Sequence, residues 1–85
     1  MRYDGGTMND LPYSSRITHD PAVMGGRACI RGMRVTAGMI IGRLASGDTP
    51  QDILDAFPYL EPDDIPAALD FAAWRLQESE SFIPA

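Results

Sequence analysis

One short stretch, residues 25–36, places the strongest constraint on how this chain can fold. It holds three glycines and three arginines and no acid, in a chain of 85 residues with twelve acids and no lysine. Gly32 stands between two short apolar runs, and glycine reaches positive φ without steric cost, so we expect a tight reversal there. The predicted product is a small β-hairpin with Arg31 at the turn and with Arg27 and Arg34 on the flanking strands.

Helix signals follow this stretch. Thr36 is placed to cap a first helix that ends at Gly47, because apolar residues recur between them at helical spacing. Thr49 followed by Pro50 indicates the start of a second, short helix that ends before Pro58. A brief strand at residues 16–18 is expected ahead of the hairpin turn. The second helix is too short to persist alone, which is typical of the middle helix of a three-helix bundle.

A third helix is expected to begin at Asp63 or Asp64, because Pro66 then falls where no backbone hydrogen bond is required. Its predicted core face consists of apolar residues at helical spacing, namely Ile65, Leu69, Ala72 and Leu76, with Ala68 beside them. Phe71 and Trp74 fall near the opposite side, where two large aromatic rings are costly to leave in water. We therefore expect them to contact a second subunit or a partner, with cover by the chain's own ends as the alternative.

The pattern divides the chain into a flexible leader at residues 1–15, one domain at residues 16–77 and a C-terminal tail at residues 78–85. In the tail, Phe82 and Ile83 are candidates either to cover the third helix or to add a second anchor for a partner. The predicted fold class is mainly α: a three-helix, helix-turn-helix-like bundle preceded by a short β-hairpin element.

Several segments resemble the signature of the domain of unknown function 433 family. Residues 25–35, Gly-Gly-Arg-Ala-Cys-Ile-Arg-Gly-Met-Arg-Val, are similar to its G-G-K-P-x-I-R-G-T-R-I motif. Residues 47–54 are similar to its G-x-[ST]-x-x-[ED]-I-L motif, and residues 57–69 resemble Y-P-x-L followed by D-I-x-A-A-L. The resemblance implies a helix-turn-helix-like domain behind a short β element. It also implies a VapB-type antitoxin, since such domains are often encoded beside a PIN-like ribonuclease toxin.

Composition narrows the function classes. The single cysteine and single histidine cannot build a zinc site, and neither an activated nucleophile nor a phosphate-binding glycine loop is evident, so we expect no metal, no cofactor and no enzyme. No apolar run approaches the roughly 18 residues that span a bilayer. A cytoplasmic protein with no membrane contact is the expectation, and the small core favours a homodimer or another partner.

Charge is divided unevenly along the chain. Residues 1–43 carry six arginines and three acids, whereas residues 44–85 carry one arginine and nine acids. Contacts to operator DNA are therefore expected from the first half, because phosphate repels the second. The candidate cations for DNA or toxin binding are Arg27, Arg31, Arg34 and Arg43. The alternative is that the hairpin arginines pair with the acidic helices inside the protein.

Two functions are compatible with these surfaces. In the first, which the family resemblance implies, the chain is the antitoxin of a type II toxin–antitoxin pair that binds and neutralises a PIN-like ribonuclease, with autoregulatory DNA binding as a secondary expectation. Arginine can pair with the carboxylates of such a nuclease, and the aromatic anchors Phe71 and Trp74 supply burial. In the second, it is a homo-oligomeric DNA-binding or adaptor module without a toxin partner. The start of the third helix is acidic, which argues against ordinary readout of DNA by a recognition helix.

Overall fold

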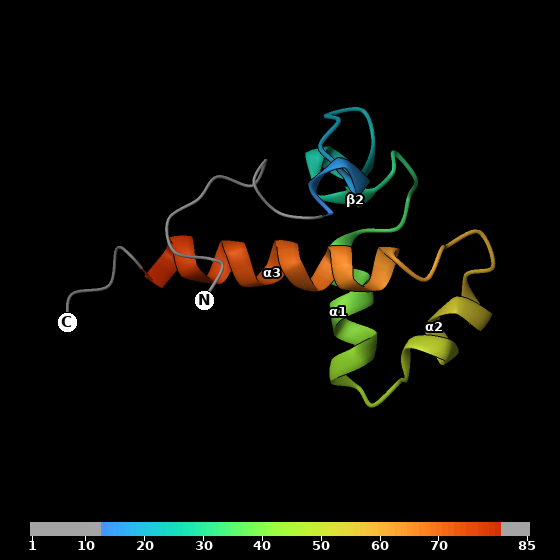
Figure 1. Ribbon diagram of the computed structural model, residues 1–85. Helices are drawn as coiled ribbons and strands as arrows, with labels where there is room; N and C mark the ends of the chain where they lie inside the picture. Colours follow the sequence, from blue (N-terminus) through green and yellow to red (C-terminus); the bar gives the residue numbers. More distant parts are fainter. Residues whose placement is uncertain (1–12, 81–85) are drawn as a thin grey trace.

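The computed structural model describes residues 13–80 and contains three helices and a two-stranded antiparallel sheet (Figure 1). The strands are β1 (Ile17–Thr18) and β2 (Cys29–Ile30), and the helices are α1 (Ala37–Ala45), α2 (Pro50–Ala56) and α3 (Asp64–Glu80). Two short 3₁₀ turns, η2 (Ser14–Arg16) and η3 (Met24–Gly26), precede β1 and β2. The predicted fold class, three helices behind a short β element, is confirmed.

The β element differs in one respect from the predicted hairpin. The predicted reversal at Gly32 is present: the Met33 N–H donates to the Ile30 carbonyl at 2.8 Å, and both Arg31 (φ 47°) and Gly32 (φ 74°) are left-handed. The segments on either side of the turn also pair as predicted, because the Ile30 N–H donates to the Val35 carbonyl at 2.9 Å and Cys29 forms an antiparallel bridge with Thr36. However, β2 has a second partner that was not predicted, β1, with Ile17 opposite Ile30. Residues 33–35 return alongside β2 without forming a regular strand. Arg27 and Arg34 therefore lie in loops, and the prediction that they occupy flanking strands was wrong.

Each of the first two helices begins at the predicted threonine. The Thr36 hydroxyl accepts a hydrogen bond from the Met39 N–H at 3.0 Å and caps α1. At α2, the Thr49 hydroxyl accepts from the Asp52 N–H at 3.1 Å, while the Asp52 carboxylate accepts from the Thr49 N–H at 2.9 Å. This reciprocal pair satisfies two backbone donors that the helix itself cannot. It also lowers the pKa of Asp52 through the bonds from Thr49.

We expect Thr49→Ala to lower the free energy of unfolding by about 1 kcal/mol, because the cap of α2 loses its hydroxyl acceptor. The measurement is a urea denaturation curve followed by helical circular dichroism. Thr49→Ser keeps the hydroxyl and should unfold at nearly the native midpoint. Equal midpoints for the Ala and Ser variants would contradict the capping role.

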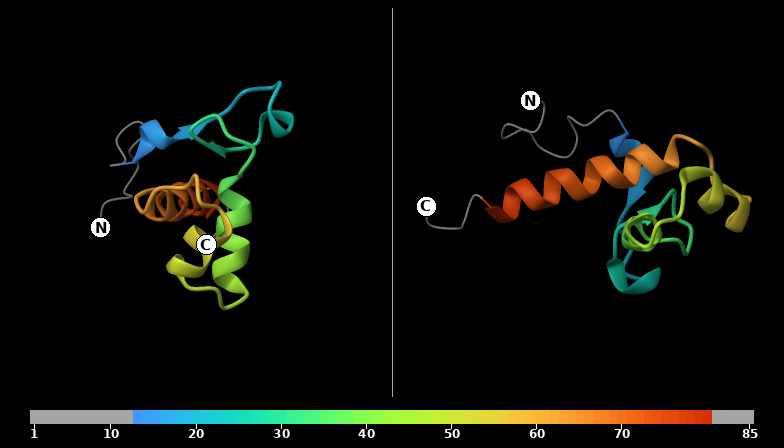
Figure 2. Two further views of the ribbon diagram at one scale, coloured as in Figure 1. Left: turned by 90° about the vertical axis from the view of Figure 1, so that its right-hand side faces the viewer. Right: turned by 90° about the horizontal axis from the view of Figure 1, so that it is seen from below.

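The core lies where α3 crosses α1, beneath the sheet. In the end-on view α3 runs between the β element and α2, with α1 at its side (Figure 2). Ile30, Ile40 and Ile53, from β2, α1 and α2, are fully buried there. Each element thus supplies an apolar side chain to one cluster, and none of the three helices needs to be stable alone.

The predicted core face of α3 was wrong. Ile65 is buried, but Leu69 is 47% exposed and Leu76 is 63% exposed. Ala68, expected beside this face, is buried, but so is Ala67, and Phe71 packs against the core. The observed face is rotated by about one residue, or 100°, from the predicted one.

The described elements extend on both sides of residues 16–77. Tyr13 packs against the core and Ser14–Arg16 forms a 3₁₀ turn. Helix α3 continues to Glu80, into the predicted tail. The interpretations given to the rest of the leader, and to Phe82 and Ile83, lie outside the described residues.

Candidate functional site

A buried carboxylate joins the β element to the start of α3. Asp64, the first residue of α3, is fully buried and accepts hydrogen bonds from Arg16 Nη1 at 2.9 Å and from Arg31 Nη2 at 2.9 Å and Nε at 3.2 Å. Its other donor is the Glu61 N–H at 2.8 Å, and Glu61 in turn pairs with Arg16 at 2.7 Å. We call Arg16, Arg31 and Asp64 the Asp64 cluster. It connects η2, the turn after β2 and the start of α3 in one network.

The Asp64 cluster favours the charged form of its carboxylate. Burial raises the pKa of Asp64, but the hydrogen bonds from Arg31, from the Glu61 N–H and from Arg16 together outweigh burial, so the pKa lies below its ordinary value. The same contacts raise the pKa of both arginines above the ordinary value, mainly through hydrogen bonds to Glu61 and Asp64 for Arg16 and to Asp64 for Arg31. The cluster is therefore a fixed set of ion pairs.

The four predicted cations have different environments. Arg31 pairs with Asp64 and also donates to the Tyr59 carbonyl at 3.1 Å, which matches the internal ion-pair alternative. Arg43 pairs with Asp48 at 2.8 Å and lies 5.4 Å from the ring centre of Phe57. These two guanidinium groups are occupied within the chain.

Arg27 and Arg34 remain exposed. The one contact that Arg34 makes through its guanidinium, among the described residues, is with the sulfur of Met24 at 3.9 Å. Arg27 forms no ion pair within residues 13–80 and borders a cleft. The structure therefore separates the four candidates into two that hold the fold together and two that face solvent.

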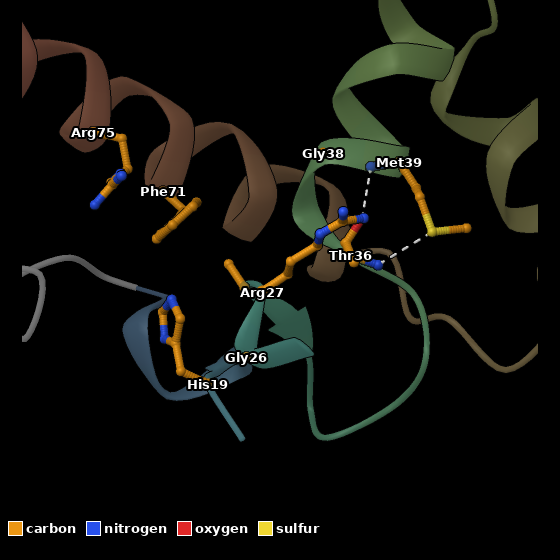
Figure 3. Close-up of a pocket in the computed structure, with 9 residues that line it drawn as sticks. His19, Gly26, Arg27, Thr36, Gly38, Met39, Phe71 and Arg75 are labelled. Carbon is orange, nitrogen blue, oxygen red and sulfur yellow. Dashed lines mark hydrogen bonds between the residues drawn. The ribbon is translucent and has the colours of Figure 1, made fainter. Parts of the chain in front are cut away.

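The cleft lies between the loop before β2, the first turn of α1 and the middle of α3, and has a volume of about 630 Å³. Its lining consists of His19, Gly26, Arg27, Ala28, Thr36, Gly38, Met39, Phe71 and Arg75. Figure 3 shows His19, Phe71 and Arg75 directed into one space, with Arg27 running toward Thr36. No acid is among these lining residues, although the chain carries a net charge of −5. We call this the basic cleft.

The later turns of α3 form a second surface. They project beyond the other described elements in two perpendicular views (Figures 1 and 2). Leu69, in the second turn of α3, and Ala73 and Leu76 farther along it follow one another at helical spacing, and both leucines are exposed. We call these three residues the leucine face. Its two leucines were predicted to be core, whereas the ring of Phe71, a predicted interface residue, lies 5.8 Å from the His19 ring and 6.2 Å from the Trp74 ring.

Sequence reasoning missed two members of these sites. Asp64 was considered only as a helix start, and Arg75 was not considered as a cleft residue. One signal for Asp64 is present in the sequence, because this acid directly precedes the apolar run that begins at Ile65. No signal in the sequence places Arg75 at the same cleft as Arg27, because its position depends on how α3 is rotated.

Within residues 13–80, no group of three or more His, Cys, Asp or Glu side chains is arranged to hold a metal ion. In the same part of the chain, no helix combines the length and apolar character that a membrane crossing requires.

Comparison with known proteins gives one family. The model of the family described as "Protein of unknown function (DUF433)" matches residues 17–72. The match runs from β1 to the middle of α3. It includes Arg31 and Asp64 of the Asp64 cluster but not Arg16, and every lining residue of the basic cleft except Arg75. No curated protein and no solved structure matches the chain.

Proposed function

The chain belongs to the DUF433 family of proteins of unknown function, and we propose that it is the antitoxin of a type II toxin–antitoxin pair, which binds and neutralises a PIN-like ribonuclease. The observation that supports this most is the leucine face. Leu69 and Leu76, 47% and 63% exposed, lie seven positions apart on one face of α3. A pair of exposed leucines on one helix face is the kind of surface that docks into an apolar groove of a partner.

The charge of the chain supports the same reading. Residues 44–85 carry nine acids and one arginine, so a partner that covers α3 is favoured when its groove has a basic rim. We assign the main anchor to Leu69 and Leu76 instead of Phe71, because Phe71 already packs against the core of this chain. Replacement of Phe71 would therefore disturb the fold as well as an interface.

DNA contact is the secondary part of this proposal. The start of α3, where a recognition helix reads bases, has Glu61 and Asp64 paired with arginines of the β element. We therefore assign autoregulatory DNA binding to the exposed side of the β element. A homodimer formed through the leucine face, without a toxin, is the competing function.

Co-expression with the PIN-like product of the adjacent gene tests the proposal. We expect this chain to restore growth of the host and to co-purify with the nuclease as a stable complex. Light scattering of the chain alone tests the competing homodimer, because a homodimer would have twice the mass of one chain. A toxic neighbour that is neither bound nor neutralised would overturn the antitoxin assignment and favour the homo-oligomeric module.

A further inference from the structure

The basic cleft has the composition of a site for a phosphate-bearing ligand. Arg27 and Arg75 are both exposed, and neither forms an ion pair with any residue of 13–80. Guanidinium groups bind phosphate through paired, charge-assisted hydrogen bonds. The other arginines of residues 13–80, except for Arg34, form ion pairs with Asp or Glu. An acidic protein thus keeps two available cations at one concave surface.

The cleft is larger than a phosphate alone requires. Its volume of about 630 Å³ falls within the roughly 300–1,000 Å³ that is common for small-molecule sites. The ring centres of His19 and Phe71 are 5.8 Å apart with an interplanar angle of 52°, and the Ala28 and Met39 side chains add apolar lining. Aromatic rings and arginine planes are the surfaces on which nucleobases stack.

Arg27 and the aromatic rings occupy different parts of the cleft. Arg27 runs toward Thr36 and Gly38 at the first turn of α1, where the helix dipole also favours an anion (Figure 3). His19, Phe71 and Arg75 surround the other part. An extended ligand with a phosphate at one end and a flat ring at the other matches this separation.

We propose that the basic cleft binds a nucleotide, with its phosphate at Arg27 beside the start of α1 and its base against His19, Phe71 and Arg75. The nucleotide is either free or the end of a single strand, since both present the same chemistry. This site is separate from the leucine face and does not depend on the antitoxin assignment.

Titration of the full chain with AMP, inorganic phosphate and a short single-stranded oligoadenylate tests the proposal by isothermal calorimetry. We expect saturable AMP binding at least tenfold tighter than that of inorganic phosphate, because the ring contacts add to the phosphate contacts. If the oligoadenylate binds more tightly than AMP, the ligand is the end of a single strand. If AMP binds as tightly or more tightly, the ligand is the free nucleotide. The fluorescence of Trp74, whose ring lies 6.2 Å from Phe71, provides a second readout.

Substitutions then separate the two ends of the site. Arg27→Gln should weaken both AMP and inorganic phosphate about tenfold, whereas Arg75→Gln should weaken AMP about tenfold and leave phosphate unchanged. Arg34→Gln removes the same charge outside the cleft and should bind both ligands within about twofold of the native protein. Thermal melts of all three variants establish that they remain folded.

Three results would overturn the nucleotide site: no saturable binding of AMP or oligoadenylate, equal affinity for AMP and inorganic phosphate, or equal losses in the Arg34 and Arg27 variants. The antitoxin assignment is tested by neutralisation of the nuclease and not by nucleotide binding, so the two proposals can fail separately. The Arg27→Gln, Arg75→Gln double variant retains the leucine face, so neutralisation of the nuclease should persist in it while AMP binding is lost.

Discussion

Replacement of Asp64 with Asn is expected to lower the free energy of unfolding by about 3 kcal/mol, because removal of one partner leaves the others of a buried ion-pair network unmatched. Two guanidinium groups would then face a neutral amide whose NH₂ is itself a donor. In a domain of this size the melting temperature should fall by on the order of 10–20 °C.

Asp63→Asn is the matched control for this substitution. Asp63 precedes Asp64, its side chain is 61% exposed, and it lies 3.7 Å from Arg16. Exposed ion pairs contribute little, so the melting temperature of this variant should remain close to the native value. If the Asp64 and Asp63 variants have the same melting temperature, the Asp64 cluster does not hold the β element to α3.

The same carboxylate gives the stability a pH dependence. Because the pKa of Asp64 is lowered in the folded protein, its contribution is complete above the ordinary aspartate pKa, near 4, and is lost as the pH falls through the lower folded value. The native protein should therefore lose stability on acidification below about pH 4. Asp64→Asn should lose less over this interval, which urea titrations at a series of pH values will measure.

The second large effect concerns the leucine face. The double variant Leu69→Gln, Leu76→Gln is expected to weaken the complex with the nuclease by on the order of 100-fold or more, because buried apolar anchors dominate interface energies. Host growth should no longer be restored. The melting temperature should change little, since both side chains are exposed in the isolated chain.

Tyr59→Gln is the control for the leucine face. Tyr59 is 55% exposed and lies in the connection between α2 and α3, away from the projecting turns. This variant removes a comparable apolar surface and should still co-purify with the nuclease. Retention of the complex by the double leucine variant would exclude the leucine face as the docking surface.

Local signals in the sequence were sufficient for the first two helices. Thr36 and Thr49 cap them as predicted, because capping depends on residues three positions apart. The start of α3 at Asp64 followed from the position of Pro66 in the same way. The turn at Gly32 was also predictable, since it needs positive φ within a two-residue loop.

The features that involve distant residues were not predictable to the same degree. Strands of two residues have too few positions for a periodic pattern, so the pairing of β1 with β2 was not anticipated. The core face of α3 was misassigned because the large side chains of Leu69 and Leu76 were given more weight than Ala67, which is buried. The role of Arg31 remained open between DNA, toxin and internal pairing until the position of Asp64 was known.

The Asp64 cluster also sets an order of events during synthesis. Arg16 and Arg31 precede Asp64 by 48 and 33 positions, so the ribosome makes both cations well before the acid that pairs with them. Contacts of such long range form late, after the entropy of closing the intervening loop is lost. A nascent chain that ends after α2 lacks the carboxylate that fixes its β element. The domain can therefore be completed only when the beginning of α3 has emerged.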